Sequence, residues 1–190
     1  MTCLRDALVP DITNMIRLDH SHVLATFRQY KPDSRPQVKQ GLVQGACVAL
    51  EIHTQLEEEI FYPALHALSD SEALRRAQPE HEELRRLVGL LRGMQPTDAR
   101  YDETFMQLMR GVLHHVAEEE TTLLPEAERL MPERLAELGR RMTHRRLQLA
   151  APRAGEVAAS MARALPTATV AAALGLLAAG LWLGLRMARS

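Results

Sequence analysis

Two segments of the chain repeat one pattern of histidine, glutamate and proline. His53 and His115 are each followed by a glutamate four residues on, a second glutamate directly after it, and a proline ten residues on. On an α-helix, side chains four residues apart lie on one face, about one turn apart. His53 with Glu57, and His115 with Glu119, would therefore each present a ring nitrogen and a carboxylate to one point. Such pairs suit iron, manganese or zinc.

A second repeated pattern precedes each of these segments. Asp19-His20, with an apolar residue three positions after the histidine, resembles Glu80-His81 in the same setting, and both hairpins keep nearly the same spacing between their histidines. The repeat unit is a helical hairpin used twice. It predicts six metal ligands: His20, His53, Glu57, His81, His115 and Glu119.

Apolar residues recur at helical spacing over five segments. We expect helices at about 10–31, 36–66, 70–93, 98–130 and 132–150, the third bent at Pro79. The first four predict an all-α fold, an up-down-up-down four-helix bundle, whose interior can hold a metal site. The fifth is an extra basic helix that would dock on the bundle or touch anionic lipid.

Four histidines fall on the apolar stripes of these helices, where leucine would be usual. Burying several ionisable groups without mutual compensation costs several kcal/mol each, which favours metal binding over a plain core role. His22 and His114 fall on wetter faces, and His66 and His144 in no repeated pattern, so we interpret these four as surface residues. The remaining glutamates of the two motifs turn away from the stripes and are interpreted mainly as solvated surface, with ligand orientation as the alternative: Glu58, Glu59, Glu118 and Glu120.

Composition limits the other classes of function. The 190 residues are 46% apolar and 25% charged with a net charge of −1, which is typical of a globular protein and gives no electrostatic reason for nucleic-acid binding. We expect no nucleic-acid partner. Cys3 and Cys47 form no closely spaced pair, which argues against a disulfide framework or a zinc finger.

The C-terminal segment 165–185 carries no charged residue and is long enough to cross a bilayer. We expect a single-pass C-terminal transmembrane helix, with an amphipathic or oligomerising helix as the alternative. Arginines are more numerous before this segment than after it, which places the metal-binding domain on the cytoplasmic side of the membrane. Gly180 and Gly184 have a spacing that allows a homodimer through this helix. The expected organisation is a bundle at 1–131, a basic helix and linker at 132–164, and the anchor at 165–185.

The repeated motifs resemble the hemerythrin-like His-His-Glu cation-binding domains. In these domains an acidic residue and histidine on one helix, and on the next a histidine, two glutamates and a Tyr-Pro or Leu-Pro pair, occur twice in a four-helix bundle. The resemblance covers about residues 10 to 130, including Pro63 and Pro125. It implies a non-haem di-iron centre bridged by Glu57 and Glu119, with manganese or zinc as other metals.

One position departs from the oxygen-carrying members of that family. They have a further histidine one turn from the one on the third helix, where this chain has Ala77 and Arg85 on either side of His81. Four histidines leave more open metal positions, so the resemblance implies reaction with, or sensing of, O2, NO or redox state at the membrane rather than oxygen carriage. His22 or His114 would supply a fifth ligand only if a helix rotated. The alternatives are a di-iron or di-manganese oxidase or peroxide-consuming enzyme, and a metal-free helical membrane scaffold.

Overall fold

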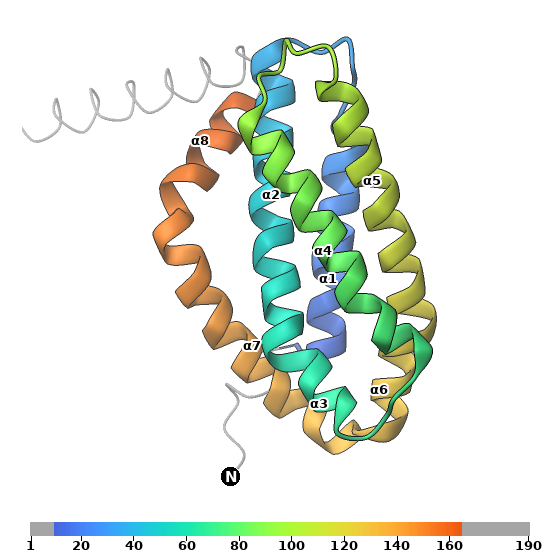
Figure 1. The fold of residues 1–190 in the computed structure, drawn as a ribbon. Helices are drawn as coiled ribbons and strands as arrows, with labels where there is room; N and C mark the ends of the chain where they lie inside the picture. The colour runs from blue at the N-terminus through green and yellow to red at the C-terminus, as the bar shows by residue number, and fades with distance from the viewer. Residues whose placement is uncertain (1–9, 165–190) are drawn as a thin grey trace, which may run out of the picture.

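Four long helices form the body of the molecule in a computed structural model that describes residues 10–164 (Figure 1). They are α1 (Ile12–Gln29), α2 (Pro36–Leu56), α4 (Glu72–Gly93) and α5 (Tyr101–Glu118), and short connections make neighbours antiparallel. Local signals fix their starts: the Asp11 carboxylate accepts a hydrogen bond from the Asn14 N–H, and Pro36 occupies the first turn of α2. The predicted all-helical bundle is therefore present.

The apolar core is divided into two clusters along the bundle axis. One contains Ile16, Leu56 and Leu74 with the short helices at one end, and the other contains Val23, Leu84 and further side chains toward the opposite end. Each long helix carries a buried histidine between the two clusters: His20, His53, His81 and His115. A polar layer is thus enclosed by apolar layers on both sides, which limits access of water to it.

Two of the expected long helices contain a π-helical turn at equivalent places. α2 continues into η2 (Glu57–Phe61) and α3 (Tyr62–His66), and α5 continues into η3 (Glu119–Leu123) and α6 (Leu124–Leu130). Proline has no N–H and clashes with the carbonyl four residues earlier, which disfavours a regular α-helix just before Pro63 and Pro125. There the residue before the proline donates five residues back, from the Tyr62 N–H to the Glu57 carbonyl and likewise in η3. Pro79, in contrast, lies inside the α-helix α4. The π-helical turns begin at the two glutamates of the repeated motif.

Two further helices lie along the outside of α1 and α2 (Figure 1). After the short turn η4 (Pro132–Arg134), α7 (Leu135–Ala150) packs against α1 and α2, and after η5 (Ala151–Arg153), α8 (Ala154–Ala164) packs against α2. Gly41 permits this contact, because a Cβ there would lie 2.6 Å from backbone atoms of α8. The stretch expected to be a basic helix and linker therefore forms two helices docked on the bundle.

The predicted transmembrane helix, and with it the membrane localisation, must be corrected. Within residues 10–164, none of the helices combines the length and apolar character needed to cross a bilayer. The prediction rested on the length and lack of charge of an Ala- and Gly-rich segment, a composition that is only moderately hydrophobic. That segment, 165–185, and the proposed dimer contact through it lie outside the described residues.

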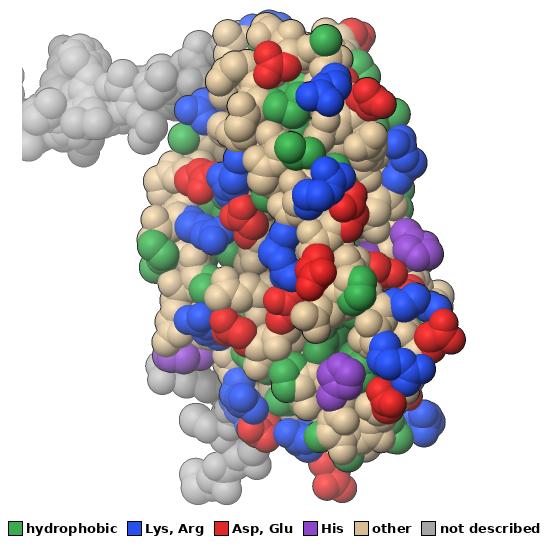
Figure 2. Space-filling model, viewed as in Figure 1, with side chains coloured by type: hydrophobic (Ala, Val, Ile, Leu, Met, Phe, Trp, Pro, Cys, Tyr) green, Lys and Arg blue, Asp and Glu red, His purple; other side chains and the backbone are tan. Residues whose placement is uncertain are grey.

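The arginines of the basic helix also have partners other than lipid. Arg145 pairs with Glu59, Arg146 with Asp19, and Arg153, in η5, with Glu51. On the face shown in Figure 2, basic and acidic side chains are interspersed. These arginines fasten the outer helices to the bundle, which is one of the two roles considered from the sequence.

Candidate metal centre

All six predicted ligands are buried side by side in the polar layer. The exposed fraction of each side chain is 6% or less. α1 supplies His20, α2 His53, α4 His81 and α5 His115, while Glu57 and Glu119 are the first residues of the two π-helical turns. The structure thus brings together every residue that the repeated pattern singled out.

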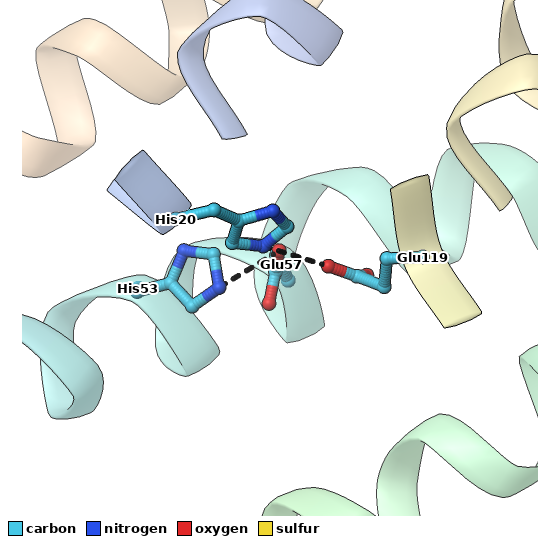
Figure 3. Close-up of side chains that lie close together, drawn as sticks. All are labelled: His20, His53, Glu57 and Glu119. Carbon is cyan, nitrogen blue, oxygen red and sulfur yellow. Dashed lines mark ion pairs between the residues drawn. The ribbon is translucent and has the colours of Figure 1, made fainter. Parts of the chain in front are cut away.

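The six side chains fall into two groups that share one glutamate. His20, His53, Glu57 and Glu119 each offer a ligand atom within 4.8 Å of the others, and so do Glu57, His81 and His115. Figure 3 shows the first group, with the two rings and the two carboxylates pointing toward one another. In each hairpin pair the histidine rings meet edge to face, with centroids 5.0 Å and 4.7 Å apart. The arrangement offers two cation positions rather than one.

Glu57 lies between the two groups. Its Oε1 is 3.2 Å from His53 Nε2, and its Oε2 is 3.4 Å from His81 Nε2 and 4.0 Å from His115 Nε2. Glu119 presents a single oxygen, Oε2, to His20 Nε2 at 3.2 Å and to His115 Nε2 at 3.5 Å. Both carboxylates can therefore reach both positions.

Four buried atoms at this point have no hydrogen-bond partner: His20 Nε2, both oxygens of Glu57 and Oε2 of Glu119. Buried polar atoms in folded proteins are nearly always hydrogen-bonded, because an unsatisfied one costs free energy. All four are acceptors or can act as acceptors, and all four face the two groups. Their chemistry fits bound cations, since a cation satisfies several nitrogen and oxygen lone pairs at once.

Each buried histidine has a carboxylate behind its ring. The Nδ1 atom is 2.9 Å from Glu120 in His20, 3.0 Å from Glu58 in His81 and 3.0 Å from Glu80 in His115. A carboxylate that accepts the Nδ1–H fixes the tautomer and leaves Nε2 free to bind a metal. In His53 the corresponding carboxylate belongs to Asp19, 3.5 Å from Nδ1. Nε2 of all four rings faces the glutamates.

For Glu58 and Glu120 the structure therefore favours the alternative, ligand orientation, although both side chains remain partly exposed. The π-helical turns change the helical phase just after Glu57 and Glu119, so an α-helical wheel places the next residue on the wrong face. Glu59 and Glu118 pair with Arg145 and Arg76 rather than with a buried histidine. The identical position of Glu58 and Glu120 in both repeats was the sequence signal for their role.

Tyr62 is a further polar residue of the centre, to which the sequence reasoning assigned no role. Its hydroxyl donates to Glu119 Oε1 at 2.8 Å and lies 3.2 Å from His81 Nε2. The side chain is 5% exposed, and its equivalent in the second repeat is Leu124. Burial and the charges of Glu57 and Glu119 raise the pKa of Tyr62 well above its usual value, which keeps the phenol protonated.

The buried charges support one another. Burial lowers the pKa of the His115 ring, but contacts with Glu57 and Glu80 outweigh it and raise that pKa to about 10. Burial raises the pKa of the Glu57 carboxyl, but the surrounding histidines dominate and hold it well below its usual value. The site therefore stabilises positive charge next to its carboxylates.

The other histidines lie elsewhere. His22 is exposed, His114 is 73% exposed, His66 is exposed, and His144 contacts Gln148 on the surface. Ala77 is buried without a ligand atom, and Arg85 pairs with Glu58. No fifth histidine reaches the centre among the residues that the structure describes.

Comparisons with known proteins agree with this geometry. A family model described as the hemerythrin HHE cation binding domain matches residues 11–127. A crystal structure of a hemerythrin HHE cation binding domain-containing protein from Mycobacterium kansasii superposes with a TM-score of 0.66 at 20% identity, covering 82% of this chain and 99% of that one. At this identity it supports the fold alone.

A curated protein from Nostoc sp., named DNA nickase, is 27% identical over 113 residues. The match covers 60% of this chain but only about a third (32%) of that relative's length. The nicking activity is that of the whole relative. The expectation of no nucleic-acid partner for this chain stays a prediction.

Proposed function

Because the chain belongs to the hemerythrin HHE cation-binding family, we propose that its buried His–Glu layer holds two iron ions and reacts with a small diatomic ligand such as O2 or NO. The single observation that carries the proposal is the set of four unsatisfied buried atoms facing two ligand groups. Manganese or zinc would fit the same nitrogen and oxygen donors. When bound, two irons would supply exchangeable electrons and coordination positions open to a small molecule.

Each of the two ions would be held by its own group of side chains. His20, His53, Glu57 and Glu119 would hold one ion, and Glu57, His81 and His115 the other. Glu57 and Glu119 would help to hold both ions, because each carboxylate lies near histidines of both groups. Tyr62 lies beside the second group, because its hydroxyl is 3.2 Å from His81 Nε2.

The carboxylates behind the rings would keep each Nε2 unprotonated and in place. Apolar layers on both sides would exclude bulk water, which strengthens the electrostatic interactions inside. Tyr62 would hold a proton on its hydroxyl beside the second group. Its donation to Glu119 Oε1 would orient that carboxylate.

The proton on Tyr62 also favours a second candidate, a peroxide-consuming metal enzyme. Cleavage of an O–O bond needs a proton at the departing oxygen, and the Tyr62 hydroxyl lies 3.2 Å from His81 Nε2. Replacing Tyr62 with phenylalanine would keep the six ligands and remove the proton. Under the second candidate, Tyr62→Phe retains iron but loses most peroxide consumption; under the first, it retains iron and its response to NO.

The experiment is anaerobic loading of the purified chain with iron(II), measurement of iron per chain, and visible spectra before and after O2 or NO is added. We expect about two irons per chain and a new absorption band on addition of the ligand. The variant His53→Ala with His115→Ala removes one nitrogen from each group and should bind little iron. A wild-type chain without iron and without spectral change would contradict the proposal.

A further inference from the structure

Arg146 and Asp19 form an ion pair directly behind His53. Arg146 Nη1 lies 2.5 Å from Asp19 Oδ1, and Nη2 lies 2.6 Å from Oδ2, so the guanidinium holds both carboxylate oxygens. The two side chains are 31% and 16% exposed, which shields the pair from much of the solvent. A series of contacts therefore runs from α7 through α1 to a predicted metal ligand on α2.

The Asp19 carboxylate faces the ring nitrogen of His53 that points away from the centre. Asp19 Oδ2 is 3.5 Å from His53 Nδ1, while Nε2 on the other side of the ring faces Glu57 at 3.2 Å. A carboxylate in this place orients the ring and selects the tautomer with a free Nε2. Movement of Asp19 would therefore alter the ring that faces the metal position.

The second hairpin lacks this arrangement. The equivalent of Asp19 is Glu80, which has one more methylene group and reaches His115 Nδ1 at 3.0 Å. Glu80 instead forms ion pairs with His115 and His114. The shorter Asp19 instead lies farther from its histidine and is held from behind by a guanidinium.

α7 is placed firmly enough to act on the centre. Leu138 and Met142 are buried in the core cluster. Gly139 lies so close to the start of α1 that a Cβ there would be 2.5 Å from the Pro10 carbonyl oxygen. Arg145, the neighbour of Arg146, binds Glu59 at 2.6 and 2.9 Å. The family match ends at residue 127, so this helix lies outside the matched segment.

We propose that Arg146 is a positioning residue of the metal centre. It holds Asp19, Asp19 holds the His53 ring, and retention of the ion by the group containing His20 and His53 therefore depends on α7. The inference rests on the proposed metal-binding function and extends the centre beyond the matched domain.

The test compares two neighbouring arginines that both fasten α7 to the bundle. Full-length wild type, Arg146→Met and Arg145→Met are loaded with iron(II) without oxygen, and the transfer of iron to an excess of chelator is followed with time. Without the guanidinium that holds it, Asp19 should support the His53 ring less well, and iron should be retained roughly tenfold less tightly. We expect Arg146→Met to release one of its two irons roughly tenfold faster than wild type, and Arg145→Met to release both at the wild-type rate. Thermal unfolding of the metal-free variants shows whether the two substitutions weaken docking equally.

Two further variants distinguish action through Asp19 from a general loosening. Arg146→Lys keeps the charge but loses the two-point contact, so it should release iron at an intermediate rate. In an Asp19→Asn background, Arg146→Met should add nothing further, because its effect passes through that carboxylate. Equal release from Arg146→Met and Arg145→Met would overturn the inference while leaving metal binding intact. A wild-type chain that holds no iron would instead overturn the proposed function and this inference with it.

Discussion

Glu57→Gln should remove both metal ions at once, because Glu57 belongs to both ligand groups. The substitution keeps the size of the side chain, which is fully buried. It replaces one acceptor oxygen with an N–H donor and removes the negative charge that faces three histidines. Each His20→Ala or His81→Ala variant, by contrast, removes a ligand from one group and should retain about one ion.

The expected change in Tm follows from the stabilisation that two bound ions provide. One ion at a free concentration about a hundred times its Kd stabilises the folded state by about 2.7 kcal/mol. For a chain of this size, each kcal/mol raises Tm by roughly 2–4 °C, so two ions should raise the wild-type Tm by roughly 10–20 °C. In Glu57→Gln we expect most of that rise to disappear.

The assay is calorimetric or fluorimetric unfolding with and without iron(II), together with iron per chain. Glu59→Gln is the matched control: it lies two residues on in the same π-helical turn but contacts Arg145 at the surface. It should keep both irons and the full rise in Tm. The reasoning is refuted if Glu57→Gln retains a metal-induced rise in Tm equal to that of the control.

Three further predictions concern pH, the carboxylates behind the rings and the outer helices. In the metal-free chain the pKa of His115 is raised to about 10, so its contribution is fully present below its unfolded pKa of about 6.5 and is lost as pH rises. Urea unfolding of the metal-free chain should show stability falling from pH 7 to 9, whereas the iron-induced gain should grow because iron displaces ring protons; a metal-free stability that rises over this range would contradict this. Glu58→Gln weakens the acceptor for the His81 Nδ1–H and should lower iron affinity by about 10–100-fold in a competition titration, and an unchanged affinity would show that Glu58 does not support the ring. Gly41→Ala forces α8 away from α2 and should cost roughly 1–3 kcal/mol of unfolding free energy. It should leave iron per chain unchanged, since Gly41 is about 18 Å along the helix from His53, and loss of iron would refute this separation.

Much of the centre was predictable because the two repeats constrain each other. A single buried histidine is ambiguous, but four at matching positions on apolar stripes select one face of each helix. The structure places these rings and the two motif glutamates in one layer. The starts of α1 and α2 also follow from visible signals, Asp11 and Pro36.

The residues that support the rings were not predictable from α-helical periodicity. π-helical turns precede Pro63 and Pro125, and the resulting change of phase brings Glu58 and Glu120 against the rings. Asp19 and Glu80 were visible as part of the repeated motif, but each supports a histidine on the following helix. That pairing depends on how the helices face one another, which sequence spacing does not contain.

The roles of the arginines in the outer helices could not be predicted for a different reason. Their number suggested a cytoplasmic membrane surface, although composition cannot show which carboxylates lie opposite them. Arg145 and Arg146 are neighbours in sequence, yet one meets a surface glutamate and the other meets Asp19 behind a predicted ligand. Tertiary contact, rather than charge count, decides their role.

Anomalous diffraction from crystals of the iron-loaded chain, recorded on both sides of the iron absorption edge, tests the central claim most directly. Two iron peaks are predicted, one among His20, His53, Glu57 and Glu119 and one among Glu57, His81 and His115. A third group nearer the surface, formed by Glu80, His114 and Glu118, also offers ligand atoms within 4.8 Å of one another. Iron only at that surface group, or no iron peak in the buried layer, would contradict the account.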